Sequence, residues 1–111
     1  MPGRAELDPD SLNRALQALP GWQLVRDEAT GNSELRKEFA FPSFAATVAF
    51  MHAAVPEIDQ LDHHPRWENR YRQLTVWTTT WDCNHRLTAQ DIALAQLLDR
   101  RFSALGGATT E

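Results

Sequence analysis

The sequence has little cysteine, no long hydrophobic run and no excess of positive charge. Its single cysteine, Cys83, excludes an intramolecular disulfide and is typical of proteins from reducing compartments. Lys and Arg number 11 against 15 Asp and Glu, giving a net charge of −4. This balance disfavours electrostatic capture of nucleic acid or of an anionic membrane.

The longest stretch with an apolar bias, residues 39–55, is interrupted by a proline and several polar side chains. It is too short and too polar to span a bilayer. The first residues contain no apolar segment of the kind found in secretory signals. We therefore expect a cytoplasmic protein that binds neither nucleic acid nor a membrane directly.

The length and composition of the chain are sufficient for one folded domain. A chain of 111 residues, 42% hydrophobic and 23% charged, supports a single core but not two. We expect one domain over residues 1–111, with its core at about 10–104 and short flexible termini. A first helix is predicted to begin at Asp8–Ser11, where acidic and capping side chains lie, and to end at Pro20 and Gly21.

Patterns of apolar residues predict the remaining elements. Strands are predicted at 22–25 and 35–41 around a hairpin loop, and one strand or two across 67–81, with a junction near Asn69 in the second case. A second helix is predicted from Pro42 and Ser43, with a bend at Pro56. Its buried stripe is predicted to be Phe44, Val48, Met51 and Val55.

A last helix is predicted to begin with a capping box at residues 88–91 and to end at Gly106 and Gly107. The predicted order is helix, two strands, helix, one or two strands, helix. This order is typical of an α+β fold, an antiparallel sheet of three to four strands with three helices on one face. The uncovered face would carry Trp77, which favours burial by a second copy and hence a homo-oligomer.

Adjacent His63 and His64, followed by Pro65, are the main candidates for chemistry. Both titrate near neutral pH, so they suit proton transfer, but histidines also bind metals or simply pack. Neighbours in an extended chain point in opposite directions, so both seldom reach one ion. The other candidate ligands, His52, Cys83 and His85, show no recognised metal-binding spacing. We expect no metal site.

Several side chains around the pair suit a small flat ligand. Asp59 and Asp62 precede the histidines and can orient an imidazole ring. Thr79 and Thr80 come at a strand end, where free backbone groups can bind an amide-like edge. Aromatic side chains that offer stacking surfaces are Trp67, Tyr71, Trp77 and Trp81. Taken singly, each of these side chains has an ordinary structural explanation. Together they predict a polar pocket for a flat ligand.

The spacing of this set resembles one family. The residues that carry the resemblance are Asp59, His63, His64, Pro65, Tyr71, Trp81 and Asp91. In this order they match the signature of the pterin-4a-carbinolamine dehydratases. The likeness extends over roughly residues 10–100, through short matches at 20–22, 35–39, 50–51, 61–62, 65–67 and 87–88.

The resemblance implies an enzyme that removes water from 4a-hydroxytetrahydropterin to give quinonoid dihydropterin. The pterin is the substrate, and no metal or organic cofactor is implied. Members are commonly homodimers or homotetramers. By resemblance, His63 and His64 are the general acid and base, and Asp59 and Asp91 orient them. The substrate-binding residues implied are Asp62, Pro65, Thr79, Thr80, Trp81 and Asp82.

The chain departs from the best-known members at Trp81, where they carry a third histidine. An indole donates a hydrogen bond but transfers no proton. His85 replaces it only if its loop folds inward, and an exposed loop histidine is the simpler expectation. Dehydratase-like proteins without activity serve as binding modules, such as Rubisco assembly chaperones, and some members are coactivators. A catalytically silent module with a protein client is therefore the alternative prediction.

Overall fold

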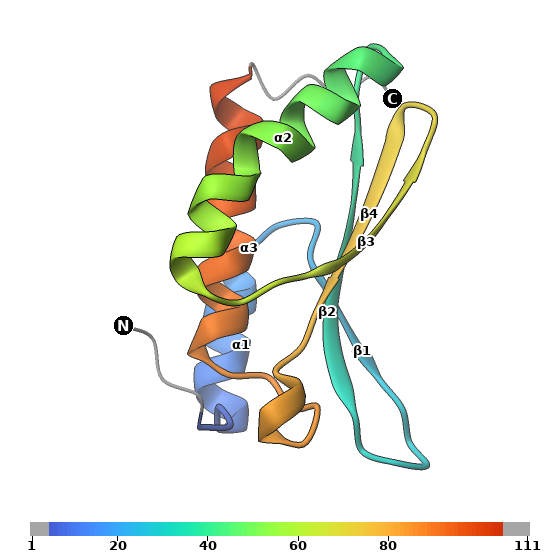
Figure 1. Ribbon diagram of the computed structural model, residues 1–111. Helices are drawn as coiled ribbons and strands as arrows, with labels where there is room; N and C mark the ends of the chain where they lie inside the picture. Colours follow the sequence, from blue (N-terminus) through green and yellow to red (C-terminus); the bar gives the residue numbers. More distant parts are fainter. Residues whose placement is uncertain (1–4, 106–111) are drawn as a thin grey trace.

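The computed structural model describes residues 5–105, which form three helices and one antiparallel sheet of four strands in the order β1-β2-β4-β3. The elements are α1 (Pro9–Gln17), β1 (Gln23–Arg26), β2 (Ser33–Ala40), α2 (Phe44–Leu61), β3 (Arg66–Arg70), β4 (Gln73–Thr78), the short 3-10 helix η1 (Trp81–Cys83) and α3 (Ala89–Ala104). All three helices lie on one side of the sheet (Figure 1). The predicted α+β fold is confirmed. The segment 67–81 contains two strands, joined by a turn at Tyr71 and Arg72, two residues beyond Asn69.

Capping side chains begin the helices where the sequence predicts. Asp8 accepts a hydrogen bond from the Ser11 amide at the start of α1, and Ser43 accepts one from the Ala46 amide in α2. Thr88 and Asp91 form a complete capping box at the start of α3. The predicted helix end at Gly106 and Gly107 lies outside the described residues, as does the predicted loose tail.

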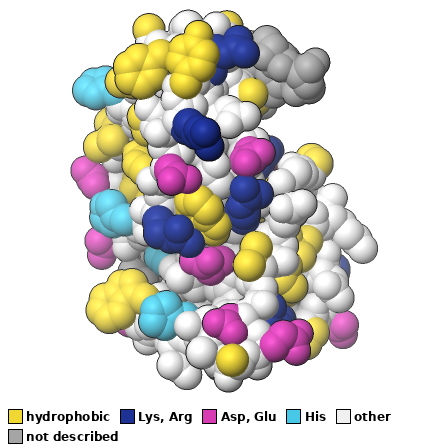
Figure 2. Space-filling view, turned by 90° about the vertical axis from the view of Figure 1, so that its right-hand side faces the viewer, with side chains coloured by type: hydrophobic (Ala, Val, Ile, Leu, Met, Phe, Trp, Pro, Cys, Tyr) yellow, Lys and Arg dark blue, Asp and Glu magenta, His cyan; other side chains and the backbone are white. Residues whose placement is uncertain are grey.

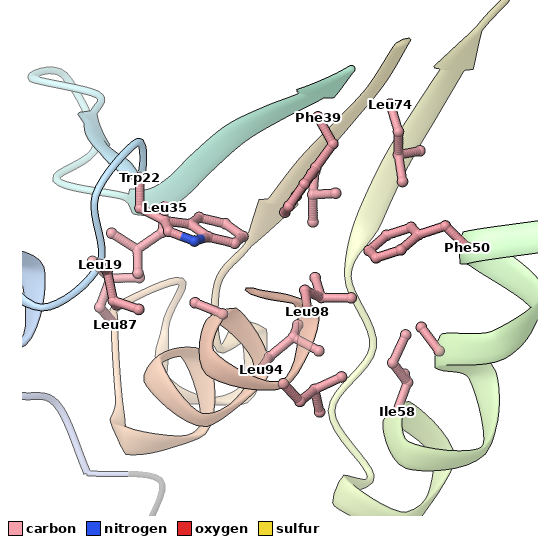
Figure 3. Packing of buried hydrophobic residues seen from close by; sticks show 14 of the residues in the cluster. Leu19, Trp22, Leu35, Phe39, Phe50, Ile58, Leu74, Leu87, Leu94 and Leu98 are labelled. Atoms are coloured by element: carbon pink, nitrogen blue, oxygen red, sulfur yellow. The ribbon is translucent and has the colours of Figure 1, made fainter. Parts of the chain in front are cut away.

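The core lies between the sheet and helices α2 and α3 (Figure 3). Leu35 and Phe39 of β2 and Leu74 of β4 are fully or almost fully buried. Aromatic side chains contact one another across these layers. The Phe39 ring centroid lies 5.4 Å from that of Phe50 in α2 and 5.1 Å from that of Phe102 in α3.

The predicted buried stripe of α2 is wrong. The side chains of α2 that face the core are Thr47, Phe50, Ala54 and Ile58. Phe44 is 51% exposed, and Val48 and Val55 are each 41% exposed. Apolar residues cover so much of this helix that two stripes have helical spacing, and the contact of Phe50 with Phe39 and Phe41 selects the other one. The helix continues through Pro56, although its axis changes direction along its length (Figure 1).

A lysine is accommodated inside the sheet by a carboxylate. Lys37 belongs to β2, which is a central strand of the sheet. Its Nζ lies 2.9 Å from Asp99 Oδ1, and Trp22 Nε1 donates to the same carboxylate at 3.1 Å. This cluster ties β2 and the segment after α1 to α3.

The other face of the sheet carries no helix. Trp77 is half-buried there between the guanidinium groups of Arg36 and Arg66, at 5.8 and 4.0 Å from its ring. Figure 2 shows this face, on which charged side chains of both signs surround hydrophobic ones. None of the helices between residues 5 and 105 combines the length and apolar composition that crossing a membrane requires.

Candidate active site

Asp91, in the first turn of α3, is a fully buried carboxylate at the centre of the site. Its Oδ1 lies 2.7 Å from His63 Nε2 and accepts from Thr78 Oγ1 at 2.6 Å. Its Oδ2 accepts from Thr80 Oγ1 at 2.7 Å and from the Thr88 amide at 2.9 Å. A buried carboxylate is tolerated only when it is hydrogen-bonded in this way, so its position is fixed by α3 and β4 together.

His63 follows a sharp turn at the end of α2. Asp62 adopts the left-handed conformation, with φ of 58°, and directs the chain back towards the sheet. The His63 side chain is only 4% exposed and contacts Asp91 through Nε2. Because Asp91 already accepts from two hydroxyls and an amide, it is the acceptor and Nε2 carries the proton. In the neutral ring, Nδ1 then holds the lone pair.

His64 makes the corresponding contact with a different carboxylate. Its Nε2 lies 2.9 Å from Asp59 Oδ1, in the last turns of α2. The two side chains are 58% and 65% exposed. The neighbouring histidines therefore use separate partners, as expected for adjacent residues in an extended segment.

One cleft of about 280 Å³ is lined by most of the predicted site residues. Its lining side chains are Asp62, His63, His64, Thr79, Trp81 and Asp82. Trp81, in η1, is 73% exposed and stands at the mouth of this cleft. Thr79 Oγ1 donates to the Ser33 carbonyl at 2.7 Å, which holds that wall against β2.

Four predicted site residues lie outside the lining. Asp59 contacts His64 and Asp91 contacts His63, each through a carboxylate oxygen. Thr80 is completely buried and bonds to Asp91 and Thr88, so it supports the site from beneath. Pro65 lies next to His64 in the chain but does not line the cleft.

One member of the buried network, Thr78, was not among the predicted site residues. The Thr78 hydroxyl donates to Asp91, yet a threonine in a strand is ordinary. The Thr88 amide donates to Asp91 as part of the predicted capping box, but the sequence gives no sign that this box belongs to the site. The available signal is that Thr78 shares the core-facing side of its strand with Leu74 and Val76, where a hydroxyl needs a partner.

Other candidates lie away from the cleft. Tyr71 is 68% exposed in the β3–β4 turn, at the end of the hairpin remote from the loop after α2 (Figure 1). His85 is exposed and lines a separate hollow, so it does not take the place of a third histidine in the cleft. Within residues 5–105, no group of three or more His, Cys, Asp or Glu side chains is arranged to hold a metal ion.

A small α+β domain with two histidine–carboxylate pairs beside one cleft has the groups that proton transfer requires. Comparison with known proteins shows to which family this domain belongs. The family model described as pterin 4 alpha carbinolamine dehydratase matches residues 5–101. The chain belongs to this family.

Individual relatives agree with this assignment. A protein of Mesorhizobium japonicum, provisionally named a pterin-4-alpha-carbinolamine dehydratase, is 34% identical over 89% of this chain and 96% of its own length. A protein of Brucella ovis with the same provisional name is 35% identical over 94% of this chain and 98% of its own. The crystal structure of a transcriptional coactivator/pterin dehydratase from Brucella melitensis superposes with a TM-score of 0.75 at 31% identity, covering 86% of this chain and 97% of that one.

Proposed function

We propose that this protein dehydrates 4a-hydroxytetrahydropterin to quinonoid dihydropterin by general acid–base catalysis. The observation that carries the proposal is the pair of histidines beside one cleft, each held by its own carboxylate. Family membership supports the substrate class.

The reaction needs two proton movements. One group protonates the 4a-hydroxyl, whose C4a–O bond breaks to release water, and another removes the proton from N5 as the C4a–N5 double bond forms. His63 suits the base, because its Nε2–H faces Asp91 and its Nδ1 is left to accept a proton. His64 suits the acid, because its exposed ring can regain a proton from solvent. The acid loses one proton and the base gains one, so exchange with water restores both.

Trp81 takes a binding role in this proposal. Its exposed indole at the mouth of the cleft offers a flat apolar face on which a pterin ring can stack. The proton steps are assigned to His63 and His64 alone.

The test is a dehydration assay on chemically generated 4a-hydroxytetrahydropterin. The wild type should accelerate loss of the substrate, and His64→Ala should lower kcat by about a hundredfold or more, the usual loss of a general acid. His52→Ala, which removes an exposed histidine of α2 outside the cleft, should leave the rate unchanged. A wild-type rate no faster than the uncatalysed reaction would refute the proposal.

We also propose that the chain forms homo-oligomers through α2. Phe44, Val48, Met51 and Val55 follow a 4-3-4 spacing along this helix, and three of them are more than two-fifths exposed. Such a stripe is typical of helices that pack against a second copy.

Light scattering after gel filtration tests this second proposal. Val48→Glu should reduce the measured mass to that of a smaller species, because it puts a charge into the stripe. Ala49→Glu is the matched control, since this exposed residue lies on another side of α2. A wild-type mass of one chain would refute self-association.

A further inference from the structure

Gln90, in the first turn of α3, is a buried side chain that uses little of its hydrogen-bonding capacity. The residue is 1% exposed, and its Nε2 donates to the Leu61 carbonyl at 3.4 Å. Among residues 5–105, its Oε1 is the one buried side-chain nitrogen or oxygen without a hydrogen-bond partner. An amide can donate two hydrogen bonds and accept two, so burying this one with a single long bond costs free energy.

The hydrogen bond to Leu61 also fixes the orientation of the Gln90 amide. The reverse orientation would place Oε1 against the carbonyl oxygen of Leu61, where two acceptors would face each other. The unpartnered atom is therefore an acceptor in either case of side-chain relaxation that keeps this bond. An apolar side chain of similar length would fill the same space without that cost, so packing alone does not account for a glutamine here.

The partner of Gln90 is the last residue of α2. The final carbonyls of a helix have no acceptor role within the helix and need donors from elsewhere. The Asp62 amide donates to the carbonyls of Ile58 and Asp59, which closes the last turn. The Leu61 carbonyl receives its donor from Gln90, so α3 caps the end of α2.

The two helix ends that Gln90 connects carry the buried histidine pair. Asp62 follows Leu61 and turns the chain, and His63 comes next. Asp91 follows Gln90 in α3 and lies 2.7 Å from His63 Nε2. The bond from Gln90 and the bond from His63 therefore join the same two segments. A displacement of one segment at the first bond changes the geometry of the second.

We infer that Gln90 is a positioning residue, which holds the end of α2 against the start of α3 so that the His63 ring stays aligned on Asp91. It does not line the cleft, so it acts through His63. A general base must lie within hydrogen-bond reach of the proton it removes, and small displacements lower kcat. The inference rests on the proposed dehydratase function and adds a residue that supports its base. A polar group kept at a cost in stability is a common compromise at active sites.

Gln90→Met tests the inference, because methionine has a similar length but neither donates to Leu61 nor leaves an amide oxygen unpartnered. The urea midpoint should stay at the wild-type value or rise, since a poorly bonded buried amide is replaced by an apolar group. In the dehydration assay kcat should fall about tenfold while KM changes by less than about twofold, because the cleft lining is intact. Gln96→Met is the matched control, an exposed glutamine later in α3, and should change none of these quantities.

The proton on His63 Nε2 gives a readout that does not depend on turnover. It is buried and faces Asp91, so its exchange with water should be slow enough to follow by NMR. Its signal is identified by its loss in His63→Gln. In Gln90→Met it should exchange about fivefold faster or more, because the contact with Asp91 opens more often. Gln96→Met should leave the exchange rate unchanged.

The outcomes separate this inference from the proposed function. A Gln90→Met protein with wild-type kcat and a wild-type exchange rate would overturn the inference. A lower urea midpoint with both of those quantities unchanged would do the same, because Gln90 would then serve the fold alone. A wild type that does not dehydrate the substrate would refute the proposed function, while the exchange rate of the His63 proton would still test whether Gln90 positions the ring.

Discussion

The two histidine–carboxylate pairs have similar lengths but opposite environments. His63 and Asp91 are 2.7 Å apart with side chains 4% and 0% exposed, whereas His64 and Asp59 are 2.9 Å apart with side chains 58% and 65% exposed. Breaking a buried pair leaves an uncompensated polar group, while a surface pair contributes little to stability. The site thus combines one ring fixed by the core with one that can adjust to a substrate and to solvent.

Asp91→Ala, which breaks the buried pair, should have the largest effect on stability and on the dehydration rate. This change leaves His63 and the hydroxyls of Thr78 and Thr80 without their shared acceptor. We expect the free energy of unfolding to fall by about 3 kcal/mol and the dehydration rate to approach background. Urea denaturation and the dehydration assay measure the two effects.

Asp99→Ala controls for the loss of any carboxylate from α3. Asp99 also bonds to donors from two other segments, but it lies away from the cleft. It should destabilise the fold and leave kcat unchanged under conditions where the variant is folded. An Asp91→Ala protein with wild-type kcat would show that the buried pair is structural only.

Thr80→Val should give an intermediate effect. It removes one donor to Asp91 while keeping the volume of a fully buried side chain. We expect a loss of about 1–2 kcal/mol in unfolding free energy and a lower kcat with little change in KM, because Thr80 supports Asp91 and does not line the cleft. An unchanged kcat together with a raised KM would place Thr80 in the binding wall instead.

The smallest effect on stability should follow Asp59→Ala. Its pair with His64 is mostly exposed, so the free energy of unfolding should fall by less than about 1 kcal/mol. The rate should decrease modestly, since His64 loses an orienting contact but remains in the cleft. A loss of stability equal to that of Asp91→Ala would remove the distinction between the two pairs.

Local signals in the sequence were enough for most of the fold. Capping side chains and turn formers set the helix starts and the first hairpin, because these depend on neighbours along the chain. The side of α2 that faces the core was not predictable in this way. Both of its apolar stripes have helical spacing, and only contact with Phe39 and Phe41 on the sheet decides which is buried.

The candidate site, too, was predictable from the sequence only in part. The adjacency of His63 and His64 predicts that they point apart, and the family resemblance supplied Asp59 and Asp91 as their partners. The depth of burial, which separates the two pairs, is a property of the packed tertiary structure. For the same reason, Thr78 could not be distinguished from a threonine present for strand propensity.

The most direct test of the two-histidine account compares dehydration rates of the wild type and Trp81→His. This substitution adds a third titratable group at the mouth of the cleft without disturbing either histidine–carboxylate pair. The account predicts a wild-type rate well above background and a change in kcat of less than about threefold in the variant at saturating substrate, since His63 and His64 already supply general acid–base catalysis. An inactive wild type and a strongly active Trp81→His variant would contradict it.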